Sequence, residues 1–245
     1  MLNIMNIGVL ACQGAFAEHL VALKHVVQDL ELSFHLVEVR DSSQLDSDLR
    51  GLIIPGGEST TLNIFFGQEA FLSKLKQWMC STNPPPVVWG TCAGLIVLSD
   101  QVEHEKTGGQ LEIGGLAVTT SRNFFGRQNK SFEQKLDLLT EDLVECYPYD
   151  KSPNFPGIFI RAPGIQAIKP SQNVRVLAEL RGYPGLPNPS AVAVEQGSLM
   201  ACSFHPELSK DLRFHAYFVR KVLKSSLPGK LSMKVYINEK WPKIL

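Results

Sequence analysis

Cys92 stands where a chemically reactive thiol is expected. It follows the apolar run 87–89, precedes the apolar run 95–98, and has Gly90 two positions before it and Gly94 two positions after it. This pattern is typical of a nucleophile elbow, a sharp strand-to-helix turn whose backbone passes too close to its surroundings for neighbouring side chains. The amino end of the following helix would favour the thiolate, which is the reactive form.

A partner for this thiol lies far downstream, in the stretch Phe204-His205-Pro206-Glu207. His205 could serve as a base for Cys92, and Glu207 could orient the imidazole, as triad chemistry requires. The alternative is a buried structural cysteine and an ordinary loop histidine. The two glycines around Cys92 favour the functional interpretation. The remaining cysteines and histidines are interpreted as structural: Cys12, Cys80, Cys146, Cys202, His19, His25, His35, His104 and His215.

The segment 55–61, Pro-Gly-Gly-Glu-Ser-Thr-Thr, follows a second buried strand. Its glycines let the backbone turn and present N–H groups, so Gly56 or Gly57 could form an oxyanion hole with the N–H of Ala93. The alternative is a tight turn followed by a helix cap at Ser59 or Thr60. The elbow elsewhere in the chain favours the oxyanion hole.

Two arginines beside apolar runs are candidates for binding a substrate carboxylate. Arg122 precedes Asn123-Phe124-Phe125, and Arg161 follows Phe159-Ile160. A guanidinium can hold a carboxylate through two parallel hydrogen bonds. A structural ion pair explains either arginine equally well.

Strand-length apolar runs alternate with amphipathic segments in the first hundred residues. This alternation predicts a parallel sheet with helices on both faces and a site at the carboxyl ends of its strands, after Ile54 and Trp89. The second half is richer in strands and ends in a helix. Predicted strands are 7–11, 34–39, 52–54, 87–89, 116–119, 157–160, 174–177, 191–194 and 199–203; predicted helices are 15–30, 71–79, one starting near 93, and 211–223. We expect one domain over residues 1–225 and a basic C-terminal tail over residues 226–245.

Composition narrows the function classes. The chain has 245 residues, 44% of them hydrophobic, and a formal net charge of +0, so a nucleic-acid partner is not expected. The five cysteines include no CxxC pair, which argues against a disulfide framework and a zinc site and favours a reducing compartment. The first residues lack signal-peptide features, and no run of about 18 apolar residues predicts a membrane span. A cytoplasmic location is expected.

Six stretches of this chain, spread over residues ~5 to ~222, resemble the sequence motifs of one protein family and occur in the same order as in that family. They are Gly8-Val9-Leu10-Ala11-Cys12-Gln13-Gly14 with Glu18-His19, the segment 55–61, Gly90-Thr91-Cys92-Ala93-Gly94-Leu95, Arg122-Asn123-Phe124-Phe125-Gly126-Arg127-Gln128 with Ser131-Phe132-Glu133, Phe159-Ile160-Arg161-Ala162-Pro163, and Ser203-Phe204-His205-Pro206-Glu207-Leu208. Together they resemble class I, triad-type glutamine amidotransferases, and more narrowly the glutaminase subunits of pyridoxal 5′-phosphate synthase.

The resemblance implies a fold and an activity. The fold is a flavodoxin-like three-layer α/β/α sandwich with a mostly parallel central sheet and an added antiparallel portion. The activity is hydrolysis of L-glutamine to L-glutamate and ammonia, with the ammonia channelled to a synthase subunit that makes the vitamin B6 cofactor. No metal or redox cofactor is implied. The partner would be that synthase subunit in a hetero-oligomeric complex, with Gln13 and the first helix near the contact.

The resemblance also implies roles for single residues. Cys92 would be the nucleophile, His205 the base and Glu207 its orienting group, with oxyanion donors at Gly57 and Ala93. The implied glutamine contacts are Gly57, Glu58, Ser59, Arg122, Ile160 and Arg161.

Two other hypotheses remain at this point. An unrelated cysteine hydrolase or protease on a similar scaffold would share the elbow but lack the glutamine contacts of residues 56–59 and Arg161. A catalytically inactive module that only regulates a synthase would have no need of Cys92, His205 and Glu207 together.

Overall fold

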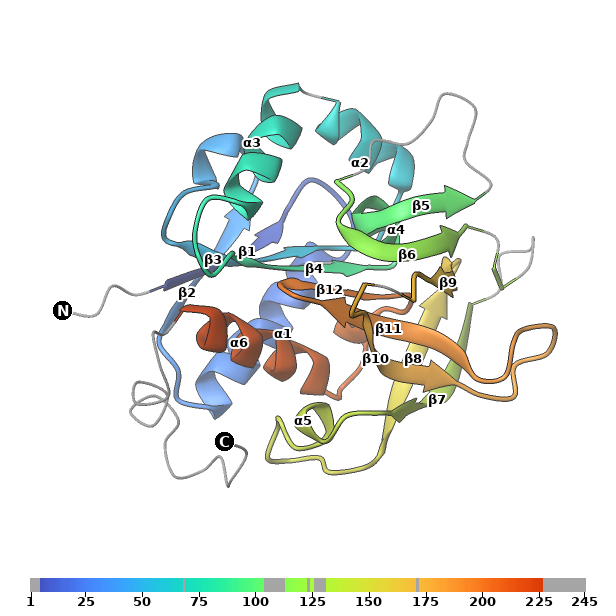
Figure 1. Cartoon of the computed structure of the whole chain (residues 1–245). Helices are drawn as coiled ribbons and strands as arrows, with labels where there is room; N and C mark the ends of the chain where they lie inside the picture. Colours follow the sequence, from blue (N-terminus) through green and yellow to red (C-terminus); the bar gives the residue numbers. More distant parts are fainter. Residues whose placement is uncertain are drawn as a thin grey trace.

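The computed structural model describes residues 5–67, 69–103, 113–122, 124, 125, 131–170 and 172–226, apart from the side chains of Ser59 and Glu69. The predicted basic tail therefore lies outside the described residues from residue 227 onward. The strands are β1 (Met5–Leu10), β2 (Phe34–Val39), β3 (Leu49–Ile54), β4 (Val87–Thr91), β5 (Ser99–Glu103), β6 (Leu116–Ser121), β7 (Ser131–Leu138), β8 (Asn154–Ile160), β9 (Gly164–Ile168), β10 (Arg175–Leu180), β11 (Ser190–Gln196) and β12 (Leu199–Cys202) (Figure 1). The helices are α1 (Phe16–Asp29), α2 (Ser59–Phe66), α3 (Glu69–Met79), α4 (Ala93–Leu98), α5 (Glu141–Val144) and α6 (Arg213–Ser226), with short 3-10 turns η1 (Ser42–Gln44) and η2 (Pro206–Leu208).

The strands form a large mixed sheet and a small one. Among the described residues, the large sheet has nine strands in the order β2-β1-β3-β4-β12-β11-β10-β7-β8, and the small one has the order β5-β6-β9. The strands from β2 to β12 in this order are parallel to their neighbours, and those from β12 to β8 are antiparallel. The α/β class is therefore confirmed, with parallel and antiparallel portions of similar extent.

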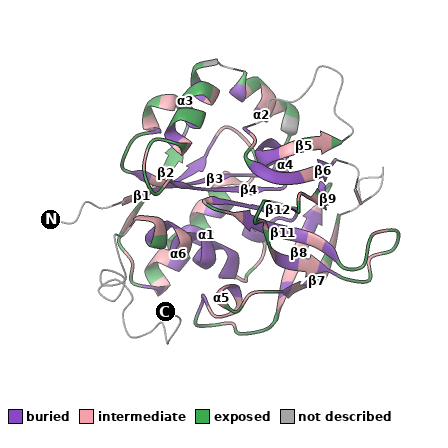
Figure 2. Ribbon diagram, in the orientation of Figure 1, coloured by how far each residue is buried: buried purple, intermediate pink, exposed green. Residues whose placement is uncertain are grey.

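Helices cover both faces of the parallel portion, because its strands carry apolar side chains on both faces. Val87 and Trp89 of β4 belong to a buried cluster with α1 and α6, whereas Val88 belongs to a second cluster with α2 and α3. This alternation is the period of two that a strand imposes. Figure 2 shows the central strands buried and the outer sides of the helices exposed.

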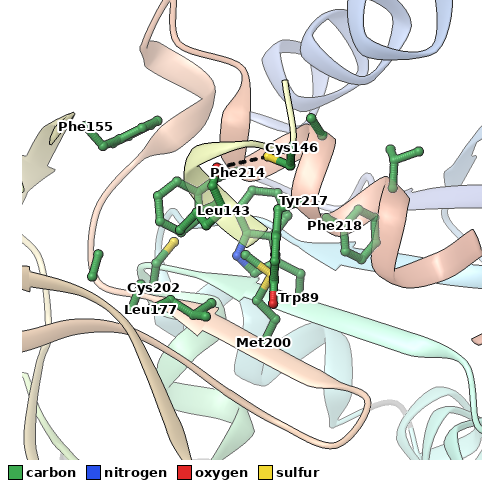
Figure 3. Packing of buried hydrophobic residues seen from close by; sticks show 14 of the residues in the cluster. Trp89, Leu143, Cys146, Phe155, Leu177, Met200, Cys202, Phe214, Tyr217 and Phe218 are labelled. Atoms are coloured by element: carbon green, nitrogen blue, oxygen red, sulfur yellow. Dashed lines mark hydrogen bonds between the residues drawn. The ribbon is translucent and has the colours of Figure 1, made fainter. Parts of the chain in front are cut away.

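Trp89 is the largest side chain of the first cluster and anchors α6 to the sheet. Its ring centroid lies 6.4 Å from that of Phe214 and 5.6 Å from that of Phe218 (Figure 3). Met200, on the neighbouring strand β12, belongs to the same cluster. Burying side chains of this size stabilises a fold by roughly 1.5–3 kcal/mol each, so this contact fixes β4 and β12 against the helix.

The register of the parallel strands brings three loops together at one edge of the sheet. Ile54 of β3 pairs with Gly90 of β4, and Thr91 of β4 pairs with Cys202 of β12. The residues that follow these strands are therefore neighbours, and they include the segment 55–58, Cys92 and His205. This edge of the sheet is where the sequence predicts the functional residues, in the loops after Ile54 and Trp89.

Most predicted elements of the first half are present, with ends shifted by a few residues, and the predicted strands 191–194 and 199–203 are present as the antiparallel neighbours β11 and β12. Helix α2 and strands β5, β7 and β9 were not among the predicted elements. No helix in the described ranges is both long and apolar enough to cross a membrane.

Candidate active site

Cys92 occupies a strained turn between β4 and α4. Its φ of 49° and ψ of −106° lie outside the regions that L-residues normally adopt, and it is the residue that caps α4. Gly90 and Gly94 make the turn feasible, because a Cβ on Gly90 would lie 2.3 Å from the carbonyl oxygen of Gly94, and one on Gly94 would lie 2.1 Å from that of Ile54. Strain of this kind clusters at functional sites, where the surrounding structure enforces it.

The thiol of Cys92 and the imidazole of His205 meet in front of Gly56. The position that a Cβ on Gly56 would take is 2.7 Å from Cβ of Cys92 and 2.7 Å from Cε1 of His205. The thiol is close enough to the imidazole to raise the pKa of His205. Cys92 is 6% exposed and His205 8%. The structure therefore brings together the two groups that the sequence assigns to nucleophile and base.

Glu207 completes the arrangement from the turn η2. Its Oε1 is 2.8 Å from Nδ1 of His205, and its side chain is fully buried. The backbone N–H of His205 donates to the carbonyl of Ile158 at 2.8 Å, which ties the histidine to β8. One ring nitrogen of His205 thus faces a carboxylate while the ring also contacts a thiol, as a Cys-His-Glu triad requires.

These neighbours change the protonation of His205. Burial is the largest single influence and lowers the pKa, but the hydrogen bonds to Cys92 and Glu207, and the negative charges of both, outweigh it and raise the pKa of His205 to about 10. The imidazole is therefore protonated at neutral pH, and an imidazolium beside a sulfur favours the thiolate.

This raised pKa predicts a pH dependence of stability. Because the folded-state value lies above the ordinary value of 6.5, the contribution of His205 to the free energy of unfolding is complete below about pH 6.5 and is lost as the pH rises toward 10. The full loss is on the order of 5 kcal/mol. Denaturant unfolding of the wild type and of His205→Gln, measured at several pH values, checks this. Parallel pH curves for the two proteins would contradict it.

The glycine loop beside the triad is held by side chains from β4 and from the loop after β1. The N–H of Gly56 donates to Oγ1 of Thr91 at 3.0 Å, so this N–H is already engaged. Nε2 of Gln13 donates to the Gly56 carbonyl at 3.4 Å, and Oε1 of Gln13 accepts from the N–H of Glu58 at 2.8 Å. Gly57 has a φ of +142° that favours glycine. Of the two glycines, Gly57 is therefore the one suited to donate to an oxyanion.

Ala93 offers the second donor by its position alone. It is the first residue of α4, and the first N–H groups of a helix have no acceptor within the helix.

The helix after the glycine loop, α2, does not begin with the Ser59 or Thr60 cap that the sequence offers as an alternative. The N-cap of α2 is Glu58, whose side chain accepts from the N–H of Thr60 at 3.2 Å.

The predicted glutamine contacts outside the segment 55–61 lie on two chain segments that the pairing of β6 with β9 in the small sheet makes neighbours. Arg122 directly follows β6, while Ile160 ends β8 and Arg161 follows it. Ser121 of β6 pairs with Gly164 of β9, so the chain after β6 and the short link from β8 to β9 lie side by side. Arg161 is exposed and has a φ of +46°, a further strained position. Residues 123 and 126–128 lie outside the described residues.

Two histidines lie on the side of Glu207 away from His205, and nothing in the sequence predicts that they approach it. His19 of α1 and His215 of α6 are fully buried, and His19 reaches Glu207. From the sequence alone, both are expected to be ordinary structural histidines. No local signal links two residues 196 positions apart, although an unpaired buried histidine on an apolar helix face is uncommon enough to be a warning.

The chain is similar to known proteins over most of its length. Residues 9–224 match the SNO glutamine amidotransferase family. "Probable pyridoxal 5'-phosphate synthase subunit pdx2" of Dictyostelium discoideum is 38% identical over 239 residues, covering 92% of this chain and 95% of that protein. "Pyridoxal 5'-phosphate synthase subunit PdxT" of Methanosarcina mazei is 40% identical over 221 residues, covering 89% and 99%.

A solved structure is also similar. It is described as "Crystal structure of glutamine amidotransferase", is 35% identical, and superposes with a TM-score of 0.69 over 88% of this chain and 98% of the other. The family match and the relatives each cover most of the chain. The chain therefore belongs to the SNO glutamine amidotransferase family.

Proposed function

We propose that this chain is a glutaminase subunit, which hydrolyses L-glutamine to L-glutamate and ammonia and passes the ammonia to a pyridoxal 5′-phosphate synthase subunit. The observation that carries the proposal is the contact of Cys92 with His205, which is in turn hydrogen-bonded to Glu207, in a member of a glutamine amidotransferase family. The printed names of the relatives support the choice of synthase. An unrelated protease function has no such support.

The proposed mechanism has two steps. The Cys92 thiolate attacks the side-chain amide carbon of glutamine, and the resulting oxyanion is held by the N–H groups of Gly57 and Ala93. The His205 imidazolium gives its proton to the departing nitrogen, so ammonia leaves and a glutamyl thioester remains. His205, now neutral, takes a proton from water as that water attacks the thioester. Glutamate is released, Cys92 is again a thiolate, and His205 is again protonated.

Recognition of the substrate is assigned to groups around this centre. Glutamine carries an α-carboxylate and an α-ammonium group. Arg122 and Arg161 lie on neighbouring segments, and a guanidinium from either could bind the carboxylate. The exposed backbone of Gly57 is available to a ligand. The remaining proposed contacts are Glu58, Ser59 and Ile160.

Gln13 is proposed as a contact to the synthase subunit. Its side chain is hydrogen-bonded to Gly56 and Glu58, on both sides of the proposed oxyanion donor. A partner that displaced Gln13 would therefore alter the oxyanion hole. This connection gives a physical reason to expect stronger activity in the complex than in the free subunit.

The finer features of the fold and location are proposed on the same basis. We infer a flavodoxin-like three-layer α/β/α sandwich and one glutaminase domain over residues 1–225, because both buried clusters share the central sheet. We infer a cytoplasmic location, because a nucleophilic thiol must remain reduced.

The direct test measures glutamate release from L-glutamine by the purified chain, alone and with a pyridoxal 5′-phosphate synthase subunit. We expect release in the mixture and weaker release by the chain alone. No release under either condition would contradict the proposed function. Transfer of ¹⁵N from amide-labelled glutamine to the synthase product, traced by mass spectrometry, would establish the fate of the ammonia.

A further inference from the structure

Two buried histidines form a pair that the proposed mechanism does not use. Nδ1 of His19 lies 2.9 Å from Nε2 of His215, and both residues are 0% exposed. The ring of Trp89 packs edge-on against both, at centroid distances of 5.7 and 5.1 Å. Burying two imidazoles costs free energy unless their polar atoms have partners, so the contacts of this pair decide what it can do.

The pair reaches the triad through Glu207. Nε2 of His19 lies 3.3 Å from Oε2 of Glu207, the oxygen that His205 does not use. This approach is too oblique to count as a hydrogen bond, and among the described residues Oε2 has no better-aligned donor. The same nitrogen is 3.3 Å from Oγ1 of Thr91, which accepts from the N–H of Gly56. His19 therefore adjoins both the triad carboxylate and the support of the glycine loop.

Electrostatics selects one arrangement of protons. An anionic Glu207 requires a hydrogen, not a lone pair, on the nearby Nε2 of His19. Neutral His19 then has a bare Nδ1, which must accept from Nε2–H of His215. That leaves Nδ1 of His215 bare, and this is the atom of His215 without a partner in the described part of the chain. The donors then run from His215 to His19, and the Nε2–H of His19 faces both Oγ1 of Thr91 and Oε2 of Glu207.

Both histidines are uncharged in this setting. Burial first, and then the unfavourable electrostatic interactions that a protonated His19 would have with His215 and His205, hold the pKa of His19 well below its ordinary value. Burial lowers the pKa of His215 to about 3. A charged His19 would compete with His205 for the carboxylate, whereas a neutral N–H edge orients the carboxylate and leaves its charge to His205.

We propose that His19, held by His215, is a positioning residue whose uncharged Nε2–H edge fixes the Glu207 carboxylate in its bond to His205. The inference rests on the proposed glutaminase function and adds a group behind the triad that touches neither glutamine nor the thiol. The hydrogen bond between His205 and Glu207 is then set from both sides, by η2 and by α1.

A matched pair of variants separates positioning from packing. His19→Gln keeps an N–H donor near the position of Nε2, whereas His19→Phe keeps the ring volume and removes the donor. In glutamate release with the synthase subunit present, we expect kcat to fall ~10–100-fold in His19→Phe, with KM for glutamine unchanged, and to be largely retained in His19→Gln. His35→Gln, an exposed histidine on β2, is the control and is expected to match the wild type.

A spectroscopic measurement provides a readout that loss of packing alone would not move. The Nδ1–H proton of His205, in its bond to Glu207, is expected as a downfield ¹H resonance that is absent in His205→Gln. It should be lost or shifted in His19→Phe and kept in His19→Gln. If His19→Phe does not fold, His215→Phe, which removes the support of His19, is expected to show the same loss.

The outcomes are distinguishable. Equal kcat for His19→Gln and His19→Phe, or an unchanged His205 resonance in the phenylalanine variant, would overturn the positioning role. Glutamate release by the wild type in that experiment would leave the proposed function intact. Absence of release by the wild type would instead refute the function itself.

Discussion

Replacing Cys92 with alanine is expected to abolish glutamate release, with a fall in kcat on the order of 10⁴-fold or more. The proposed reaction passes through a thioester, which requires the sulfur of Cys92. The measurement is glutamate release with the synthase subunit present, for wild type and variant at equal concentration. KM would be undefined rather than raised, because the covalent step is removed.

A matched control removes a thiol elsewhere. Cys80 is free and exposed just after α3, and Cys80→Ala is expected to retain wild-type release. Alkylation by iodoacetamide should inactivate the wild type and Cys80→Ala alike. Release by Cys92→Ala at the wild-type rate would remove Cys92 from the role of nucleophile.

Replacing Gly90 with alanine is expected to lower the free energy of unfolding by about 3 kcal/mol, at the upper end for added core volume. The new Cβ would lie 2.3 Å from the carbonyl oxygen of Gly94, 2.4 Å from its carbonyl carbon and 2.9 Å from the nitrogen of Leu95. All three are backbone atoms of the first turn of α4, so relief requires the turn itself to move. Because Cys92 lies within this turn, glutamate release should fall as well.

Gly182→Ala is the control for this substitution. Gly182 has a φ of +69° and no atom within 4 Å of the position of a Cβ. Its replacement therefore carries only the backbone penalty, about 1 kcal/mol, and should leave glutamate release unchanged. Denaturant unfolding of the two variants separates steric conflict from backbone strain. Equal losses in both would contradict the close approach of β4 and α4.

The sequence is enough to propose the triad because Cys92 and His205 each follow a strand and carry a local signature. The glycines around Cys92, and the Pro206 that starts η2 after His205, are short-range signals that need no knowledge of the partner strands. The parallel alternation of the first half likewise predicts where the loops after β3 and β4 lie. Local sequence is sufficient to propose a functional residue where a single turn, such as those at Cys92 and His205, determines both the backbone conformation and the reactive group.

Other parts of the fold lack such signals. Strand β5 contains Asp100, Gln101 and Glu103 among its five residues, and the eight residues of β7 include three charged ones and Gln134, which interrupts its apolar face. Their strand conformation comes from pairing with distant segments, which sequence propensity does not report. The contact of His19 with Glu207 and His215 is of the same kind, since it depends on α1 and α6 packing on one face of the sheet.

The order of the strands also determines when the triad can first exist. Strand β12 lies between β4 and β11, and His205 follows it. Cys92 therefore does not have His205 beside it until about four fifths of the chain have been made. At translation speeds of ~5–20 residues per second, the nascent protein carries an unpaired thiol for roughly ten seconds before the histidine emerges. A nascent chain that ends before residue 205 therefore lacks the proposed triad, and we expect glutamine hydrolysis to begin only after β12 has been inserted next to β4.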